Sequence, residues 1–165
     1  MKLIPTGEMT LGPFFPREFA QAANDLAAGV KGEVIEITGR ITQLDGKALD
    51  NVVVELWQAD GKGRFDNPDF FGWGRAATNA EGVYRFRTIK PGAYEGRAPH
   101  VNLLLLYSGL MRQLHTVMFF DLAKDPVLDA VPAARRPLLV ATREGTVYRF
   151  DIRLRGEAET PFFDD

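Results

Sequence analysis

Apolar and polar side chains alternate with a period of two residues along several short stretches of this chain, a pattern that is typical of β-strands. Turn-forming Gly, Pro, Asn and Asp residues separate these stretches. Many short strands between such turns favour an antiparallel β-sandwich, so the pattern predicts a mainly β protein. Helix is expected only over residues 17–28 and, for a turn or two, between Pro126 and Arg136. The expected strands cover residues 34–42, 52–57, 83–87, 100–107 and 146–155.

For two of these strands, the sequence also predicts the pairing or the burial. The dipeptide Asp45-Gly46 is a hairpin turn signal, so residues 52–57 are expected to return alongside residues 34–42. The stretch 100–107 is almost entirely apolar and is therefore expected to be buried on both of its faces.

Length, charge and cysteine count narrow the class of protein. The 165 residues are expected to form one domain, in which an N-terminal arm (residues 1–33) precedes the β-sandwich (residues 34–165). A net charge of −2 with both signs mixed gives no reason to expect a nucleic-acid partner. The absence of cysteine excludes disulfides and thiolate metal sites. No apolar run is long enough to cross a bilayer, so we expect a cytoplasmic protein without a membrane partner.

The segment Thr10-Leu11-Gly12-Pro13-Phe14-Phe15-Pro16 stands out within the arm. Gly12-Pro13 favours a sharp turn, and the two adjacent Phe rings require burial. In one interpretation, the Phe14 and Phe15 side chains anchor the arm to the core or to a neighbouring chain. The other is an arm that lines a pocket, including a pocket in a partner.

A near-complete metal site lies at the start of the apolar strand. Ferric iron favours phenolate and imidazole ligands, and a His-x-His pair on a strand sends both rings to one face. The chain offers Tyr94 and His100, but Asn102 stands where the second imidazole would be. Two such ligands are too few to hold ferric iron. The only other histidine, His115, is expected to be a structural residue.

Taken together, the motifs of this chain resemble those of the intradiol ring-cleavage dioxygenases. The resemblance is closest to the alpha-type subunits of the heteromeric members that act on protocatechuate. It covers nearly the whole length, and its most specific pieces are the Trp-Gln-Ala-Asp and Lys-Pro-Gly motifs. The matching segments are residues 10–15, 37–40, 54–60, 63–64, 71–75, 89–94, 125–128 and 148–153.

The resemblance implies which residues stand at the iron-ligand positions of the family. Its iron-bearing beta subunits use two Tyr and two His, and the matching positions here are Phe65, Tyr94, His100 and Asn102. Only Tyr94 and His100 are competent, so no iron is expected in this chain. Arg97 matches an Arg that precedes the His pair, so Tyr94, His100 and Arg97 are expected to be vestigial catalytic positions.

The resemblance also implies a function in a complex. An iron-bearing beta subunit would hold Fe(III) and cleave a catechol-type substrate such as protocatechuate with dioxygen. The arm of the alpha subunit helps to form that pocket, so Thr10, Gly12 and Pro13 are expected to contact the substrate. The isolated chain is then expected to be inactive.

Two other interpretations stay open. One is a metal-independent β-sandwich that serves as a binding or structural module. The other is a homomeric iron enzyme that rebuilds its site from Tyr94 and His100 with His115, Asp60 or Asp66. The alpha-type interpretation predicts an apolar surface on the isolated chain, for which the tail residues 160–163 and the arm pair Phe14-Phe15 are candidates.

Overall fold

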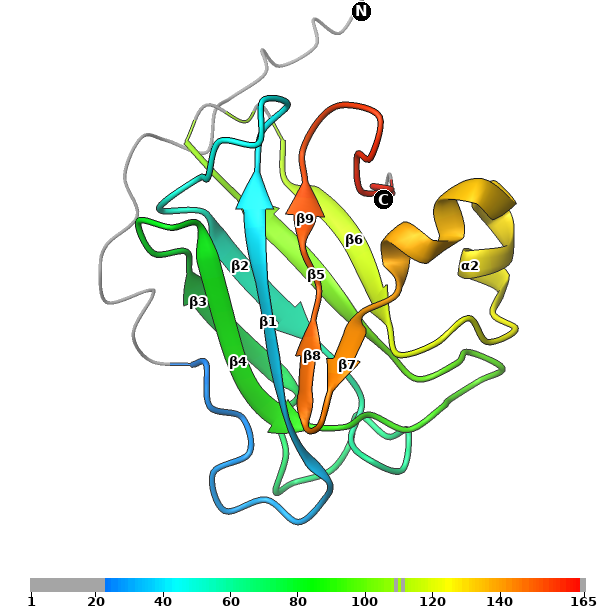
Figure 1. Cartoon of the computed structure of the whole chain (residues 1–165). Coiled ribbons are helices and arrows are strands. Elements are labelled where there is room, and N and C mark those ends of the chain that lie inside the picture. The colour runs from blue at the N-terminus through cyan, green and yellow to red at the C-terminus, as the bar shows by residue number, and fades with distance from the viewer. Residues whose placement is uncertain (1–22, 109, 111, 164–165) are drawn as a thin grey trace, which may run out of the picture.

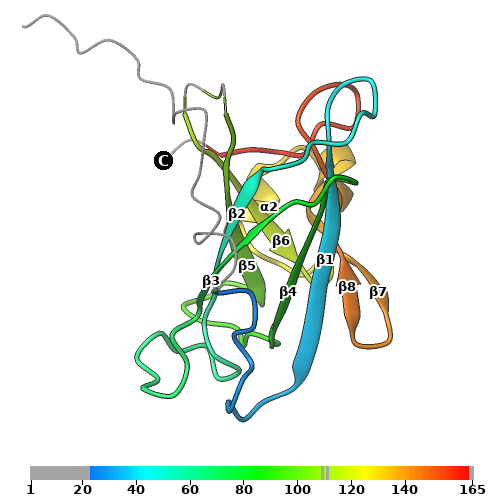
Figure 2. The same ribbon diagram turned by 90° about the vertical axis from the view of Figure 1, so that its left-hand side faces the viewer.

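The chain folds into two β-sheets packed face to face, as the computed structural model of residues 23–108, 110 and 112–163 describes (Figures 1 and 2). The front sheet has the strand order β4-β1-β8-β7, with β9 beside β1, and the back sheet has the order β3-β2-β5-β6. The predicted β-sandwich is confirmed. The elements are β1 (Val34–Thr42), β2 (Val53–Trp57), β3 (Trp73–Ala77), β4 (Val83–Ile89), β5 (His100–Leu106), β6 (Leu114–Phe119), α2 (Pro126–Ala130), the 3-10 helix η1 (Ala133–Leu139), β7 (Thr142–Glu144), β8 (Val147–Arg149) and β9 (Ile152–Arg153).

The core lies between the two sheets and follows the period-two pattern. Alternate residues of each strand point inward, so that residues 35, 37 and 41 of β1 meet residues 101, 103 and 105 of β5 in one buried cluster. The outward residues of β5 are Asn102, Leu104 and Leu106, and they are only half-buried. The expectation that this strand is buried on both faces is therefore wrong for its outer face.

The predicted hairpin between β1 and β2 is also wrong. A tight turn does form, because the Gln43 and Lys47 backbones are joined by a hydrogen bond of 2.9 Å. However, β1 pairs with β4, whereas β2 crosses to the back sheet and lies between β3 and β5. Asp45-Gly46 sets only the local reversal of the chain. The partner of β2 is set by its four consecutive buried residues, which fit a central strand.

The C-terminal strand predicted over residues 146–155 is divided into β8 and β9. Both pair with β1 in the parallel direction, so the sandwich is mainly rather than wholly antiparallel. The division falls at Asp151, whose carboxylate accepts a hydrogen bond of 2.9 Å from the Arg40 backbone amide. This side-chain contact takes the place of a ladder hydrogen bond at that position.

The helix predicted over residues 17–28 is absent from its described part, residues 23–28. Ala23 instead accepts a hydrogen bond of 3.0 Å from Arg75 of β3, and Leu26 donates one of 2.8 Å to Arg87 of β4. The segment thus joins the edge strands of the two sheets and closes one side of the sandwich. The helix expected after Pro126 is confirmed as α2. Within the described residues, no helix has the length and apolar character needed to cross a membrane.

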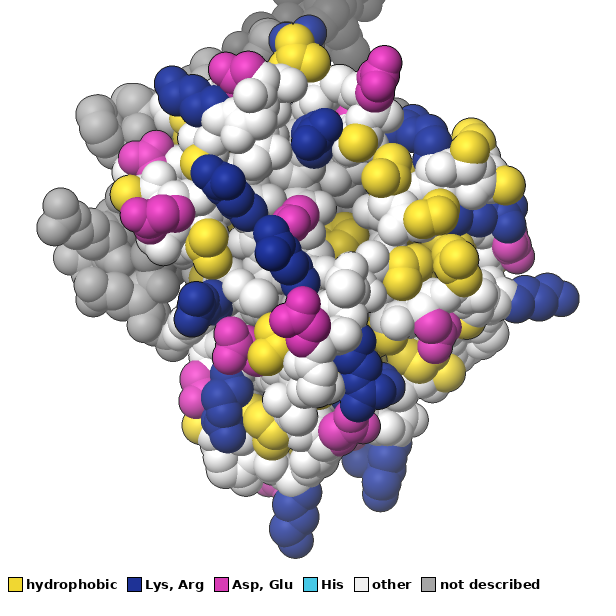
Figure 3. All heavy atoms as spheres, in the orientation of Figure 1, with side chains coloured by type: hydrophobic (Ala, Val, Ile, Leu, Met, Phe, Trp, Pro, Cys, Tyr) yellow, Lys and Arg dark blue, Asp and Glu magenta, His cyan; other side chains and the backbone are white. Residues whose placement is uncertain are grey.

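The outer face of the front sheet is covered with charged side chains. Figure 3 shows Lys and Arg intermixed with Asp and Glu over this face, while hydrophobic side chains gather toward α2 and η1. Arg85 and Arg87 of β4 and Arg149 of β8 are all exposed. This face is therefore a solvated surface.

Candidate functional site

Tyr94 and His100 form a hydrogen-bonded pair at the first residue of β5. The Tyr94 hydroxyl lies 3.2 Å from His100 Nε2, and the two rings are 5.3 Å apart. His100 is only 2% exposed, because its ring also packs at 5.7 Å against Phe119 of the neighbouring strand. Strand pairing therefore holds the imidazole in place, and the loop before β5 brings the phenol to it.

The hydrogen bonds fix the protonation of this pair. His100 Nδ1 lies 2.7 Å from the Ala98 carbonyl oxygen, which can only accept, so Nδ1 carries the proton. Nε2 is then the acceptor, and the Tyr94 hydroxyl donates to it. Burial lowers the pKa of His100 and raises the pKa of Tyr94, which favours the neutral form of both groups.

A tight turn places Tyr94 opposite His100. The backbones of Tyr94 and Arg97 are joined by two hydrogen bonds, of 2.7 and 3.3 Å, and the two residues between them have positive φ angles. These are 47° for Glu95 and 76° for Gly96, the pattern of a type I′ turn. Glu95 adopts a left-handed conformation, which costs energy for a residue with a Cβ atom. The surrounding structure must therefore stabilise this turn, because the backbone preference of Glu95 does not.

Phe65 completes the surroundings of the Tyr94 phenol. The two rings meet edge to face, with centroids 5.0 Å apart at 88°. Glycine allows this approach: a Cβ on Gly63 would lie 2.1 Å from the Ala93 carbonyl oxygen, and one on Gly92 would lie 2.7 Å from the Gly61 oxygen. The loop that contains Gly61 and Gly63 is therefore in backbone contact with the loop that contains Gly92 and Ala93. This contact brings Phe65 against Tyr94.

Arg97 is joined to the residue that caps α2. Its Nε donates a hydrogen bond of 2.7 Å to Asp125, which is fully buried. The same carboxylate accepts from the Ala98 amide at 2.9 Å and caps α2 through Val127 and Leu128. Burial alone would raise the pKa of Asp125, but these hydrogen bonds outweigh it and hold the pKa below its usual value.

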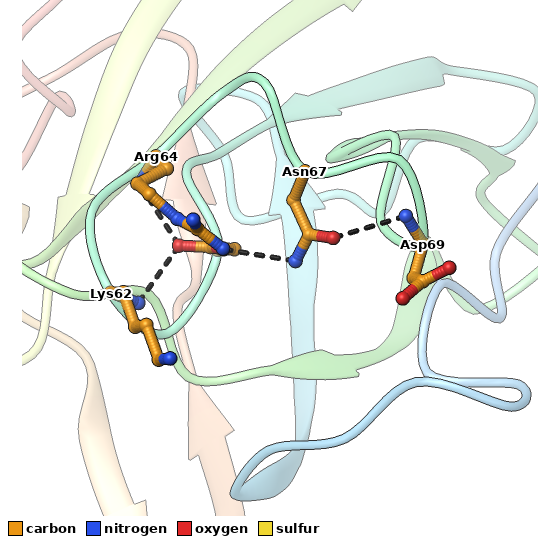
Figure 4. A network of polar contacts seen from close by, with 5 residues as sticks. Lys62, Arg64, Asn67 and Asp69 are labelled. Carbon is orange, nitrogen blue, oxygen red and sulfur yellow. Dashed lines mark hydrogen bonds and ion pairs between the residues drawn. The ribbon is translucent and has the colours of Figure 1, made fainter.

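Asp60 accepts hydrogen bonds from three residues of the loop that carries Phe65, namely Lys62, Arg64 and Asn67, which are labelled in Figure 4. Its Oδ1 accepts from the Lys62 and Arg64 amides at 2.8 and 2.9 Å, and its Oδ2 accepts from Asn67 at 2.9 Å. The Arg64 guanidinium pairs with Oδ2 at 3.2 Å. Although burial opposes it, this set of donors lowers the pKa of Asp60. Both oxygens are occupied by the loop, so Asp60 is a structural residue.

His115 and Asn102 lie on the same face as His100 but at other positions along it. Asn102 follows His100 by two residues on β5, and His115 pairs with Leu104, four residues from His100. At about 3.3 Å per residue, His115 is roughly 13 Å along the strand from the imidazole of His100. The structure therefore does not bring His115 to the Tyr94–His100 pair. Asp66 is exposed on the loop that follows Arg64.

The residues present do not form a ferric site with two Tyr and two His ligands. Tyr94 Oη and His100 Nε2 lie close enough to share one ion, but Phe65 offers only ring carbons and Asn102 only a neutral amide. Over the described ranges of the chain, no group of three or more His, Asp or Glu side chains is placed to hold a metal.

Sequence reasoning missed the role of Asp125. In the sequence it belongs only to the matching segment 125–128, whereas in the structure it links Arg97, the loop before β5 and α2. The Asp-Pro pair that begins α2 is a helix-start signal that could have identified the cap. Thr10, Gly12 and Pro13 lie outside the described residues.

Comparisons with known proteins agree on one family. The family model described as "Dioxygenase" matches residues 11–156. The chain is 34% identical to the protocatechuate 3,4-dioxygenase alpha chain of Burkholderia cepacia, over 96% of both chains. It is 40% identical to the beta chain from the same organism, over 79% of this chain and 68% of that one.

Solved structures show the same fold. The dioxygenase domain of a dioxygenase–carbohydrate-binding protein fusion from Streptomyces sp. SirexAA-E superposes with a TM-score of 0.66 at 28% identity, covering 92% of this chain and 98% of the other. Catechol 1,2-dioxygenase from Acinetobacter sp. ADP1 gives a TM-score of 0.61 at 22% identity, covering 96% of this chain and 66% of the other.

Proposed function

Because this chain belongs to the intradiol dioxygenase family, we propose that it is an alpha-type subunit of a protocatechuate 3,4-dioxygenase-like enzyme. In this proposal the chain keeps the fold but lacks a complete set of iron ligands. An iron-bearing beta-type partner holds Fe(III) and cleaves a catechol-type substrate with dioxygen, and the present chain shapes the partner's active site.

The state of the Tyr94–His100 pair is the observation that carries this proposal. The His100 lone pair that would bind a metal instead accepts a hydrogen bond from Tyr94 at 3.2 Å. Phe65, the position of a third ligand by family resemblance, offers only ring carbons and packs against Tyr94 with ring centroids 5.0 Å apart. Asn102, the position of a fourth ligand by family resemblance, is an amide. A site with two of four ligands retained supports a subunit that has lost iron rather than an independent enzyme.

The N-terminal arm, residues 1–33, is the proposed contribution of this chain to catalysis. Thr10, Gly12 and Pro13 match the arm of the family's alpha subunits. In this proposal they line the substrate pocket of the partner, where the Thr10 hydroxyl and backbone amides donate hydrogen bonds to the acidic group of the substrate. Tyr94, His100 and Arg97 are remnants of the ancestral catalytic site and hold the loop before β5.

The test compares the chain alone with the chain co-expressed with the beta-type subunit from the same genome. Alone, we expect a protein without iron, without visible absorption and without oxygen uptake on catechols. Co-expressed, we expect a hetero-oligomer that takes up oxygen with protocatechuate, and a Thr10→Val variant of this chain that raises KM more than it lowers kcat. A coloured, iron-loaded chain in isolation would overturn the proposal. A chain that never associates with the beta-type subunit would favour the binding-module interpretation.

A further inference from the structure

A cavity of about 650 Å³ opens at the end of the sandwich that lies away from the Tyr94–His100 pair. Its walls come from three connections: the turn after β1, the segment between β5 and β6, and the segment after β9. All three lie near the top of Figure 1. Tyr107, in the wall of the cavity, follows the first residue of β5 by roughly 23 Å at the rise of a β-strand. The cavity is therefore separate from the candidate site.

The wall of this cavity is aliphatic and continues the core. Leu49, Leu114 and Leu154 line it, and they belong to or pack against the buried cluster between the two sheets. Leu44 and Leu110 also line it, and Leu44 is 66% exposed. An apolar ligand in the cavity would remove this leucine surface from water, which is favourable.

Backbone hydrogen bonds hold two of the three walls in place. In the turn after β1, the Gly46 amide donates to the Gln43 carbonyl oxygen at 3.0 Å. After β9, the Leu154 amide donates to the Thr42 carbonyl oxygen at 2.9 Å, which ties this segment to the end of β1. The cavity is therefore preformed, as small-molecule sites usually are.

The cavity has one charged side chain without a partner. Asp45 and Arg155 both line it, but Asp45 Oδ1 accepts a hydrogen bond of 2.9 Å from the Lys47 amide within its own turn. Arg155 is exposed, and among the residues that the structure describes no acidic group pairs with it. The Gln43 amide and the Ser108 hydroxyl add neutral donors to the lining. These groups favour an anionic head group on the ligand.

We propose that this cavity binds a small aliphatic carboxylic acid, with its alkyl chain against the leucines and its carboxylate at Arg155. The fork of donors on a guanidinium matches the two oxygens of a carboxylate. The volume of about 650 Å³ lies within the usual range of small-molecule sites, roughly 300 to 1,000 Å³. The proposed function does not depend on this site, so the two are tested separately.

Isothermal titration calorimetry of the full chain with decanoate, below the concentration at which decanoate forms micelles, tests the proposal. We expect saturable binding of about one decanoate per chain. Decanol has an alkyl chain of the same length but no charge, and it is expected to bind about tenfold more weakly.

Two substitutions separate the head group from the alkyl chain. Arg155→Gln is expected to weaken decanoate binding about tenfold and to leave decanol binding unchanged. Leu44→Asn is expected to weaken the binding of both ligands about threefold or more, because part of the apolar wall is lost. Both residues are exposed, so thermal unfolding is expected to stay unchanged. Arg85→Gln is the matched control, since it removes an exposed guanidinium from the outer face of the front sheet.

Three results would overturn the proposal. Heat that never saturates, with unfolding of the chain, would mean that decanoate acts only as a detergent. Equal affinity for decanoate in the unsubstituted chain and in Arg155→Gln would mean that the carboxylate is not recognised. Absence of decanoate binding, together with a dimer that Leu44→Asn converts to a monomer, would assign the cavity to a second copy. Saturable binding that only Arg155→Gln and Leu44→Asn weaken supports the site, whether or not the chain associates with a beta-type subunit.

Discussion

The two outer faces of this sandwich are made from the same kind of alternating strand but differ in chemistry. On the front sheet the outward positions are charged, as Arg85, Arg87 and Arg149 illustrate (Figure 3). On the back sheet the outward positions hold Trp57, Trp73 and Leu104, and the Tyr94–His100 pair lies at one end of that face. A folded sandwich needs only its inner faces to be apolar. The exposed aromatic rings on this outer face, Trp57 and Phe71, are therefore a sign of function rather than of folding.

The largest effect is expected from restoring the missing iron ligands on the back face. The double variant Phe65→Tyr/Asn102→His adds a phenol beside Tyr94, whose ring is 5.0 Å from that of Phe65, and an imidazole on the same strand face as His100. We expect it to bind about one ferric ion per chain, because two phenolates and two imidazoles form a complete ligand set. Iron analysis and the visible absorption of iron-bound tyrosinate measure the result.

The triple variant that adds Tyr94→Phe is the control for that experiment. It keeps the new phenol and imidazole but removes the oxygen that now donates to His100. Iron content that is the same in the double and triple variants would mean that the metal binds elsewhere. A double variant without iron would mean that Tyr94 and His100 are no longer positioned to share a ligand.

The loop before β5 offers the next largest effect. Asp125→Ala removes a fully buried carboxylate that holds Arg97, the Ala98 amide and the start of α2. Leaving Arg97 without its partner and α2 without its cap is expected to lower the free energy of unfolding by about 3 kcal/mol or more. Urea unfolding measures the change.

Asp129→Ala is the matched control on the same helix. Asp129 pairs with Arg136 at 3.2 Å, but Asp129 is exposed to solvent and Arg136 is only half-buried. Its removal is expected to cost less than about 1 kcal/mol. Equal losses for the two substitutions would contradict the view that the Arg97–Asp125 pair holds the site together.

Ion pairs allow the two outer faces to be compared directly. Glu55→Ala on the back face removes a carboxylate with only 11% of its side chain exposed, which accepts charge-assisted hydrogen bonds from Arg75. We expect a loss of about 2 kcal/mol in the free energy of unfolding. Arg87→Ala on the front face removes an exposed pair with Asp25, which is expected to cost less than about 1 kcal/mol. Thermal unfolding of both variants at low and high salt tests the contrast, since only the exposed pair is screened.

The alternation of side chains was enough to predict the sandwich and to locate most of its strands. It could not assign strands to sheets, because the turn at Asp45-Gly46 reverses the chain equally well whether β2 pairs with β1 or crosses to β5. Likewise, the parallel pairing of β8 with β1 depends on contacts between segments about 110 residues apart, which no local pattern contains.

The candidate site was predictable where it depends on residue type and not where it depends on tertiary contact. Tyr94 and His100 were identified from their chemistry and spacing, and the structure brings them together. The tail residues Phe162 and Phe163 were expected at an interface, but they pack against the buried clusters of the chain. The exposed rings are instead Phe71 and Trp57, which pack with the half-buried Trp73.

The smallest expected effect is a pH dependence that arises from His100. Burial lowers its pKa in the folded chain, whereas in the unfolded chain it titrates near the usual value of about 6.5. The unfolded state therefore binds a proton more readily, so the contribution of His100 to stability is fully present above about pH 6.5. It is lost as the pH falls through that value toward the lower pKa of the folded chain. Urea unfolding between pH 8 and pH 5.5 measures the loss.

His100→Gln isolates this contribution, since glutamine cannot titrate and the other histidine, His115, is unchanged in both proteins. The difference in unfolding free energy between the unsubstituted chain and the variant is expected to shrink as the pH falls. The carboxylates Asp60 and Asp125, whose folded pKa values are also lowered, contribute only at more acidic pH, because unfolded carboxylates titrate near 4. A difference that does not change with pH would mean that His100 accepts a proton on the back face as easily as in water, and that its pairing with Tyr94 does not hold it neutral.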